Sequence, residues 1–257
     1  MLEIRNIHKT YNPGTVRELG LFDGFSLSVE AGQFLSIVGS NGSGKTTLLN
    51  ILCGSIPVDA GQILLDGQDI TRQKEHLRSR RMARIYQNPA MGTCAKMTIQ
   101  ENMALADNKF KRMNLLPGTE KARIPLYREM LSELGLGLEN MMQARAGSLS
   151  GGQRQALAMT MARLAPIEFL VLDEHTAALD PKAAEVIMEL TDRMVKQHKL
   201  TAIMVTHNLR FALDYGDRLL MMHQGQAVLD AAGDEKKALR MENLLSLFNE
   251  ISIECGN

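Results

Sequence analysis

The 257-residue sequence has few cysteines, no excess charge and no long apolar runs. Its three cysteines, Cys53, Cys94 and Cys255, are far apart and lack the spacing of a metal site. This favours a reducing compartment over a disulfide framework. Lysine and arginine number 29, as do aspartate and glutamate, so the formal net charge is zero. A neutral balance argues against broad electrostatic binding to nucleic acid or to an anionic membrane, and we predict no nucleic-acid partner.

Membrane-spanning and targeting segments are also missing. No stretch approaches the roughly 18 apolar residues that cross a bilayer, and the N-terminal MLEIRNIHKTYN has no apolar signal core. We therefore expect a chain that is soluble by itself and reaches a membrane only through a partner. No internal repeat is present. The length suffices for one large domain, or for one domain with an additional lobe.

One segment that is present indicates the class of ligand. Residues 39–46 read GSNGSGKT and follow the unbroken apolar run of residues 34–38. In this pattern, G-x-x-x-x-G-K-[ST], glycines turn backbone N–H groups inward and the following helix adds its positive dipole end. Lys45 is expected to reach the terminal phosphates of a nucleotide, and the Thr46 hydroxyl to hold Mg²⁺. The alternative, a glycine-rich turn that binds nothing, is disfavoured by the strand-like run before it and the helix-like LLNIL after it.

The first part of the chain indicates strands, and the middle part indicates helices. Residues 2–38 alternate apolar and polar, which predicts short antiparallel strands followed by a buried one. A helix over residues 45–53 should end at Gly54, and Asp66-Gly67 is a hairpin signal. From 88 to 148 strand signals vanish and helical spacing prevails. We interpret residues 88–148 as a separate helical lobe.

Strands and helices then alternate. Residues 169–172 and 201–205 are continuous apolar strands, and Asp180-Pro181 should cap and open a helix that runs to about Gln197. Uninterrupted apolar strands with helices between them predict a parallel sheet covered on both faces. A last hairpin is expected at Gln224-Gly225.

For two further segments we prefer a structural interpretation to a functional one. The tail from about Asp234 predicts one helix that packs on its own domain rather than serving as a dimer contact. Its apolar face comprises Met241, Leu244, Leu245, Phe248 and Ile251. The basic run from Arg72 to Arg84, with Arg78, Arg80 and Arg81, could indicate nucleic-acid binding. Because no aromatic is interleaved before Tyr86, we expect a solvated helix instead.

Polar residues follow each predicted buried strand. Asp173 and Glu174 follow residues 169–172, and His207 follows residues 201–205. Ligands bind outside the carboxyl ends of parallel strands, so these groups should meet the phosphate loop around one nucleotide. Asp173 would then hold Mg²⁺, which would offset the cost of an unpaired carboxylate, Glu174 would polarise the attacking water, and His207 would contact the γ-phosphate. Taken singly, they could also be a helix cap, a solvated carboxylate and a satisfied histidine.

A second helix start decides the family. Residues 149–155 read LSGGQRQ, with Ser150 at an N-cap position and two glycines before a helix. This is a second anion-binding helix start, for which a single-site nucleotide enzyme has no need. With this LSGGQ motif the chain resembles the nucleotide-binding subunits of ABC transporters over essentially its whole length.

The resemblance implies an α/β fold. It comprises a phosphate-loop NTPase core with a mainly parallel sheet and an N-terminal antiparallel β subdomain (residues 1–87 and 149–257) and an inserted helical subdomain (88–148). It implies ATPase activity with ATP and Mg²⁺. Tyr11 matches the aromatic that stacks on adenine, Gln87 the glutamine that senses Mg²⁺, and Asp180 the loop that touches the opposite subunit. The nucleotide contacts so implied are Tyr11, Gly39, Ser40, Asn41, Gly42, Ser43, Gly44, Lys45, Thr46, Thr47, Gln87, Ser150, Gly151, Gly152, Gln153 and Asp180. The implied metal ligands are Thr46, Gln87 and Asp173, and the catalytic residues are Glu174, His207 and Lys45.

Departures from the family pattern are small. Ser40 and His175 stand where proline is frequent, and Ala178 where serine is usual, which could alter communication between subunits. The motif residues are otherwise intact, so the resemblance implies a head-to-tail homodimer. Each ATP would lie between the phosphate loop of one copy and Ser150 and Gly152 of the other.

The resemblance also implies partners and a location. A lone cassette is typical of bacterial importers, with permease subunits, an extracytoplasmic substrate-binding protein and a place on the cytoplasmic face of the membrane. Residues 89–93 would receive a permease helix, unless they form an internal loop without a partner. The run DEHTAALDP (residues 173–181) resembles cassettes for aromatic or other hydrophobic amino acids. The main rival is a soluble scaffold ATPase similar to those of iron–sulfur cluster assembly. A pure binding module is disfavoured because it needs neither Glu174 nor His207.

Overall fold

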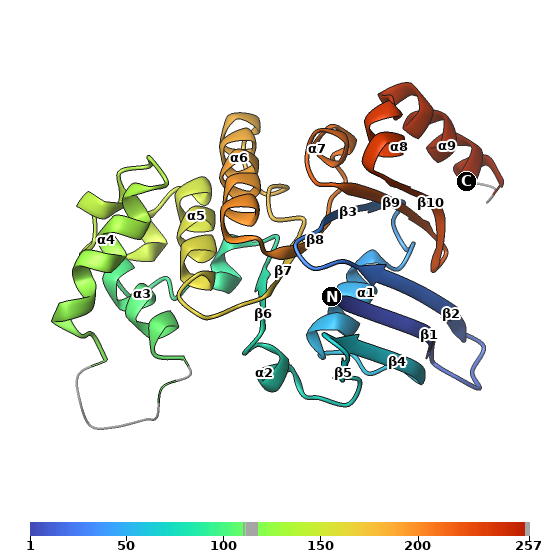
Figure 1. Ribbon diagram of the computed structural model, residues 1–257, viewed down its shortest axis with the longest axis horizontal. Coiled ribbons are helices and arrows are strands. Elements are labelled where there is room, and N and C mark those ends of the chain that lie inside the picture. The colour runs from blue at the N-terminus through green and yellow to red at the C-terminus, as the bar shows by residue number, and fades with distance from the viewer. Residues whose placement is uncertain (110, 112–117, 255–257) are drawn as a thin grey trace. The chain divides into compact units, whose positions relative to one another are not determined.

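A computed structural model describes residues 1–109, 111 and 118–254 (Figure 1). The chain divides into two compact units, Met1–Ser79 with Val195–Asn257, and Arg80–Met194. Cys255 lies outside the described residues. Cys53 is buried, as a small core residue should be, and Cys94 is exposed; both are free thiols. No helix in the described part of the chain combines the length and the apolar character that crossing a bilayer requires.

The first unit contains the predicted antiparallel sheet, in the order β2-β1-β4-β5. Its central strand β1 (Leu2–Tyr11) pairs with β2 (Leu19–Val29) and with β4 (Ala60–Leu65), and β5 (Gln68–Asp69) closes the edge. Asp66 and Gly67 connect β4 to β5 with φ of 50° and 75°. Two successive residues at positive φ suit the tight hairpin turn that the Asp-Gly pair predicted.

Parallel strands form the second sheet region of this unit. Strand β3 (Phe34–Gly39) pairs in parallel with β8 (Thr201–Val205) and with β9 (Arg218–His223), and β10 (Gln226–Ala232) runs antiparallel to β9. Every residue of β3 and β8 is buried, which explains why neither strand alternates apolar with polar residues. The predicted α/β class and the Gln224-Gly225 hairpin are confirmed.

The C-terminal tail differs from the single predicted helix. It forms α8 (Gly233–Ala238) and α9 (Met241–Glu254), separated at Leu239, whose extended backbone (φ −66°, ψ 134°) ends the first helix. Leu244 is fully buried, with Leu247 and Phe248 beside it, in a cluster that includes residues of β3, β9 and the helix α7 (Leu209–Asp214). The tail therefore packs on its own unit, as expected.

Leu245 was wrongly assigned to the apolar face of this tail. It is 47% exposed, because one residue along a helix rotates the side chain by about 100° from Leu244 and out of the packed stripe. The side chain of Ile251, which was assigned to the same face, lies outside the described residues.

The basic run also differs from its prediction. Only Glu75–Arg78 is helical (α2), and Arg78 is buried, with 4% of its surface exposed. Its guanidinium donates to the carbonyls of Ile51 (2.7 Å) and Leu52 (2.8 Å) in α1 (Lys45–Cys53). The last carbonyls of a helix have no partner within it, and arginine presents five donors in a fixed fork. Arg78 therefore completes the end of α1 and is not a solvated surface residue.

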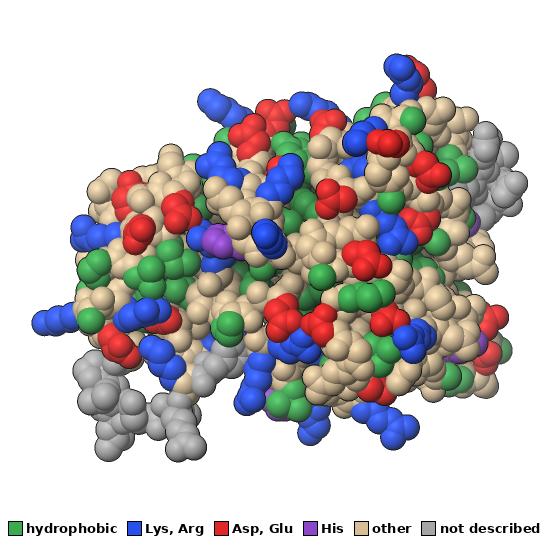
Figure 2. Space-filling model, viewed as in Figure 1, with side chains coloured by type: hydrophobic (Ala, Val, Ile, Leu, Met, Phe, Trp, Pro, Cys, Tyr) green, Lys and Arg blue, Asp and Glu red, His purple; other side chains and the backbone are tan. Residues whose placement is uncertain are grey.

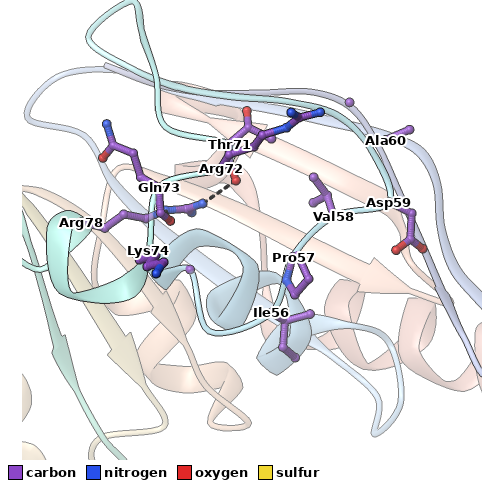
Figure 3. Close-up of a pocket in the computed structure, with 12 residues that line it drawn as sticks. Ile56, Pro57, Val58, Asp59, Ala60, Thr71, Arg72, Gln73, Lys74 and Arg78 are labelled. Carbon is purple, nitrogen blue, oxygen red and sulfur yellow. Dashed lines mark hydrogen bonds between the residues drawn. The ribbon is translucent and has the colours of Figure 1, made fainter.

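Arg78 also fixes the loop that returns from the antiparallel sheet. It donates to the carbonyls of Gln73 (3.0 Å) and Thr71 (2.9 Å), and Figure 3 marks the contact between Arg78 and Thr71 with a dashed line. The close-up shows these residues at the wall of a surface pocket of about 600 Å³, across from residues 56–60. Arg72 lies at the same pocket but is exposed.

Replacing Arg78 with methionine should lower the free energy of unfolding by about 3 kcal/mol, because each buried carbonyl left without a donor costs ~1–3 kcal/mol. Urea unfolding followed by circular dichroism measures this change. The matched control is Arg72→Met at the same pocket, which should change the free energy of unfolding by less than about 0.5 kcal/mol. Equal stabilities of the two variants would contradict the role given to Arg78.

The second unit combines two parallel strands with a helical core. Strand β6 (Met82–Ile85) pairs in parallel with β7 (Phe169–Asp173). Its described helices include α3 (Ile99–Asp107), α4 (Ile124–Ser132), α5 (Gly151–Ala162) and α6 (Pro181–His198). The last residues of α6, 195–198, are counted with the first unit. A buried cluster joins α3, α4 and α5 and includes Ile99, Met103, Tyr127, Leu131 and Leu157. The boundaries 88–148 of the helical lobe remain a prediction.

Charges of both signs are interspersed on the face of the molecule shown in Figure 2. On the face shown in Figure 2, blue and red side chains alternate, and no broad area of one sign appears among the described residues. This distribution agrees with the net charge of zero.

Candidate functional site

The phosphate loop of the first unit has the backbone that its glycines predicted. Gly39, Gly42 and Gly44 have φ of 154°, 80° and 102°. A Cβ on Gly39 would lie 2.2 Å from the Met222 carbonyl oxygen, and one on Gly44 would lie 3.1 Å from the Phe22 ring. Both positions therefore require glycine, since any side chain would clash or force a strained φ.

Lys45 lies inside this loop. It is 4% exposed, and its Nζ donates to the carbonyls of Gly39 (2.7 Å) and Ser40 (2.9 Å) and lies 3.4 Å from Ser43 Oγ. The ammonium group is thus held by neutral oxygens, and a phosphate oxygen is a stronger acceptor because it is charged. Gly44 precedes α1 without any side-chain cap, so the N–H groups of the first turn are oriented for an anion.

Tyr11 and His207 belong to the same unit. The Tyr11 hydroxyl contacts Thr47 Oγ1 at 3.4 Å, which places the ring at the end of β1 near the first turn of α1. His207 is exposed and lies one residue beyond Thr206, the residue that follows β8. Because β3 and β8 are parallel neighbours, the phosphate loop and His207 leave the sheet at the same edge. This part of the predicted convergence is present in the structure, whereas the roles of Tyr11 and His207 stay predictions.

Asp173 has a partner that the sequence analysis missed. It ends β7, is 9% exposed, and accepts a hydrogen bond from Arg84 of the neighbouring strand β6. The Arg84 guanidinium also lies 4.9 Å from the centre of the Tyr86 ring. A buried carboxylate without a counter-charge is costly, and Arg84 supplies the charge that we had expected only from Mg²⁺.

Glu174 has a strained backbone. Its φ of 46° is rare for a residue with a side chain and costs ~1–3 kcal/mol, which contacts of the surrounding residues must offset. The next residue, His175, is 1% exposed, and its Nε2 lies 3.0 Å from Thr191 Oγ1 in α6. Burial lowers the pKa of His175 to about 3, so the ring is neutral at physiological pH. Glu174 itself is partly exposed.

The LSGGQ segment begins α5 with a complete capping box. Ser150 Oγ accepts from the Gln153 N–H, and the Gln153 side chain accepts from the Ser150 N–H, both at 3.2 Å. A Cβ on Gly151 would lie 3.0 Å from Leu179, and one on Gly152 would lie 3.2 Å from Ala183. The two glycines therefore allow a close approach to the start of α6, while Ser150 stays exposed.

Asp180 is the N-cap that the sequence predicted. Its Oδ1 accepts from the Ala183 N–H at 3.0 Å at the start of α6. A pocket of about 220 Å³ lies at this place and is lined by residues of the LSGGQ segment and of α6, including Ser150, Gly152, Asp180 and Val186.

Gln155 is a second residue that sequence reasoning missed. It is fully buried in α5, and its Nε2 donates to the Tyr86 carbonyl at 3.1 Å. Gln87, the residue after Tyr86, is exposed. Helix α5 is therefore hydrogen-bonded to the residue that precedes Gln87, and a glutamine in an otherwise apolar helix face was the only sequence signal for this contact.

The candidate residues thus form two groups, each arranged within one unit. Residues 39–47, Tyr11 and His207 lie in the first unit, and Gln87, Asp173, Glu174, residues 150–153 and Asp180 lie in the second. The described residues contain no cluster of three or more His, Cys, Asp or Glu side chains that could hold a metal ion.

Comparisons with known proteins identify the family. Residues 22–177 match the family model described as ABC transporter, and the chain belongs to this family. It is 44% identical over 248 residues to the tyrosine transport ATP-binding protein of Clostridioides difficile (strain R20291), with 96% of this chain and 98% of that protein covered. It is 31% identical to the phosphonates import ATP-binding protein PhnC of Alcaligenes faecalis, with 90% of this chain and 82% of that protein covered.

Solved structures agree with this assignment. The ADP conformation of MJ1267, an ATP-binding cassette of an ABC transporter, aligns with a TM-score of 0.79 at 28% identity and covers 100% of this chain and 99% of that one. A dimeric post-hydrolysis state of the cassette MJ0796, bound to ADP and Pi, aligns with a TM-score of 0.75 at 26% identity, covering 90% and 98%. The chain is therefore an ATP-binding and ATP-hydrolysing cassette of the ABC transporter type. The relatives named are transport proteins, which does not favour the iron–sulfur scaffold alternative.

Proposed function

We propose that this chain powers a bacterial importer for aromatic or other hydrophobic amino acids. The observation that carries the proposal is the 44% identity to a tyrosine transport ATP-binding protein over nearly the full length of both chains. The run at residues 173–181 pointed to the same substrate class. As a cassette of an importer, the chain works on the cytoplasmic face of the membrane with permease subunits and an extracytoplasmic substrate-binding protein.

Two copies of the chain act together. Each ATP binds between the phosphate loop of one copy and Ser150 and Gly152 of the other, and only ATP, with its γ-phosphate, contacts both surfaces. The geometry supports this arrangement, because Ser150 is exposed at a helix start that carries no acidic residue in its first turn. The dimeric MJ0796 cassette is a structural neighbour at 26% identity.

The residues that would hold Mg²⁺ have hard oxygen donors, which this ion prefers. They are the Thr46 hydroxyl, the Gln87 side chain and the Asp173 carboxylate. The ion supplies charge neutralisation for the phosphates when it is bound. Lys45 neutralises phosphate charge, Glu174 accepts the proton of the attacking water, and His207 contacts the γ-phosphate.

The permease surface includes the segment after Gln87. Residues Pro89–Gly92 form a short 3₁₀ helix, and Met91 is 67% exposed. Arg154 donates to Thr93, so this segment is hydrogen-bonded to α5. A permease helix bound here would thus contact a segment that is hydrogen-bonded to the helix that begins at the LSGGQ motif.

Uptake by cells tests the proposal. Cells that lack this chain should lose most high-affinity uptake of labelled tyrosine, and the wild-type chain should restore it. Ser150→Arg should not restore uptake, because the larger side chain fills the place of the partner's phosphate. Ser132→Arg, at an exposed serine that ends α4, is the matched control and should restore uptake fully.

Unchanged uptake of tyrosine and of labelled phenylalanine without the chain would contradict the proposed substrate class, and a loss of phosphonate uptake would identify a different one. Full restoration by Ser150→Arg would contradict the shared site.

A further inference from the structure

The backbone of Glu174 cannot hold its conformation without help. Its φ of 46° lies in the left-handed region, where a side chain is strained. The carbonyl of Glu174 accepts from the Ala177 N–H at 2.9 Å, which closes a turn directly after β7. A turn of this kind persists only when neighbouring residues are fixed by packing and hydrogen bonds.

His175, the residue that follows Glu174, is held in place by burial and a hydrogen bond. It is 1% exposed, and its Nε2 lies 3.0 Å from Thr191 Oγ1, which is itself fully buried. The Thr191 hydroxyl lies 2.7 Å from the Ile187 carbonyl and donates to it. A hydroxyl has one proton, so it accepts from His175, and Nε2–H is the donor of this hydrogen bond.

This hydrogen bond connects Glu174 to two helices that carry family motifs. Thr191 and Ile187 belong to α6, which begins directly after Asp180. Met159 Sδ, 3.7 Å from the same hydroxyl, belongs to α5, which begins at the LSGGQ segment. His175 therefore joins the turn at Glu174 to both helices in the interior of one unit.

We propose that His175 is a positioning residue for Glu174, acting through its hydrogen bond to Thr191. The proline that is frequent at this position stiffens the chain by its ring, whereas this chain fixes the turn by a buried polar contact. The inference rests on the proposed function of Glu174 as the group that polarises the attacking water. The competing interpretation is a core histidine whose hydrogen bond serves stability alone.

Three variants separate positioning from stability. Thr191→Val removes the hydroxyl and keeps the shape, and Thr191→Ser keeps the hydroxyl. The double variant His175→Leu with Thr191→Val removes both polar partners, which should regain most of the thermal stability that Thr191→Val loses, because no donor is left unpaired. For each variant we would measure kcat and KM for ATP, the Kd of a fluorescent ATP analogue, and Tm.

Thr191→Val should lower kcat by about tenfold, since small misplacements of a catalytic group are costly, and leave the Kd and KM for nucleotide within about twofold. Thr191→Ser should keep kcat within about twofold of the wild type. The double variant should regain Tm but not kcat. The Thr191→Val chain should also accumulate an ATP-bound dimer in gel filtration, because its hydrolysis is slowed after binding.

Wild-type kcat in Thr191→Val would overturn the proposal. Recovery of kcat together with Tm in the double variant would also overturn it, because the role would then be structural alone. A rise of KM without a change in kcat would do the same. Glu174→Gln tells the failure of this proposal from the failure of the proposed role of Glu174: if that variant turns over ATP normally, the role of Glu174 fails, whatever Thr191→Val does.

Discussion

Replacing Glu174 with glutamine lowers ATP turnover by about a hundredfold or more and leaves nucleotide binding intact. Glutamine has nearly the same size as glutamate, but its amide cannot accept a proton from water. A positioned general base contributes about 10²–10⁴-fold to a rate. The strained backbone of Glu174, its partial exposure and its place at the end of β7 are the features that a positioned base requires. Phosphate release at saturating ATP, together with the Kd of an ATP analogue, measures the two effects separately.

Glu189→Gln is the matched control for this experiment. Glu189 is exposed on α6 of the same unit, and its replacement should leave kcat within about twofold of the wild type, as is usual for a surface position. Turnover of Glu174→Gln at the wild-type rate would show that another group acts as the base. A loss of nucleotide binding equal to the loss of turnover would show that Glu174 contributes to affinity and not to chemistry.

Replacing Lys45 with alanine abolishes hydrolysis and weakens ATP binding. The ammonium group is buried inside the phosphate loop, so its charge acts on the phosphates with little screening by water. Removing one such preorganised charge costs about 10²–10³ in rate. Without the ammonium group, the carbonyls of Gly39 and Ser40 lose this donor, and their electronegative oxygens face the ligand. Calorimetry with ATP, followed by a phosphate-release assay, measures both losses.

A distant lysine provides the control for this variant. The Lys237 side chain is 78% exposed and pairs with Asp234 in α8, so Lys237→Ala should bind and hydrolyse ATP as the wild type does. Circular dichroism establishes that Lys45→Ala is folded before its activity is compared. Undiminished binding and turnover in folded Lys45→Ala would contradict the role of the phosphate loop in ATP binding and hydrolysis.

Features that depend on neighbouring residues were predicted well from the sequence. The strand, loop and helix around GSNGSGKT, the Gly54 helix end and the Asp180 cap all follow from short-range patterns. Each is determined by a few consecutive residues, because strand alternation, glycine conformations and caps act over one or two turns of chain.

Features that depend on distant partners were missed. Arg78 meets Ile51 across 27 residues, Gln155 meets Tyr86 across 69, and Arg84 meets Asp173 across 89. In each case a polar side chain forms a hydrogen bond with a distant partner that no local sequence pattern identifies. A charged residue in a basic run looks solvated until the fold brings a row of backbone carbonyls to it, as it does for Arg78.

The candidate site divides in the same way. Its motif residues were all named from the sequence, because each motif is contiguous. The residues that fix them, Arg84, Gln155 and the pair His175–Thr191, were not assigned a role, because their partners lie on other helices and strands. His175 was noted as a departure from the family pattern, but only its burial against Thr191 gives that departure a physical meaning.

The measurement that bears most directly on the central claim is the mass in solution of Glu174→Gln, determined by analytical ultracentrifugation with Mg²⁺ and either ATP or ADP. We expect the mass of two chains with ATP and of one chain with ADP, and one chain with either nucleotide once Ser150→Arg is added. A single-chain mass with saturating ATP, or a dimer that persists with Ser150→Arg, would contradict the claim that two copies share each nucleotide.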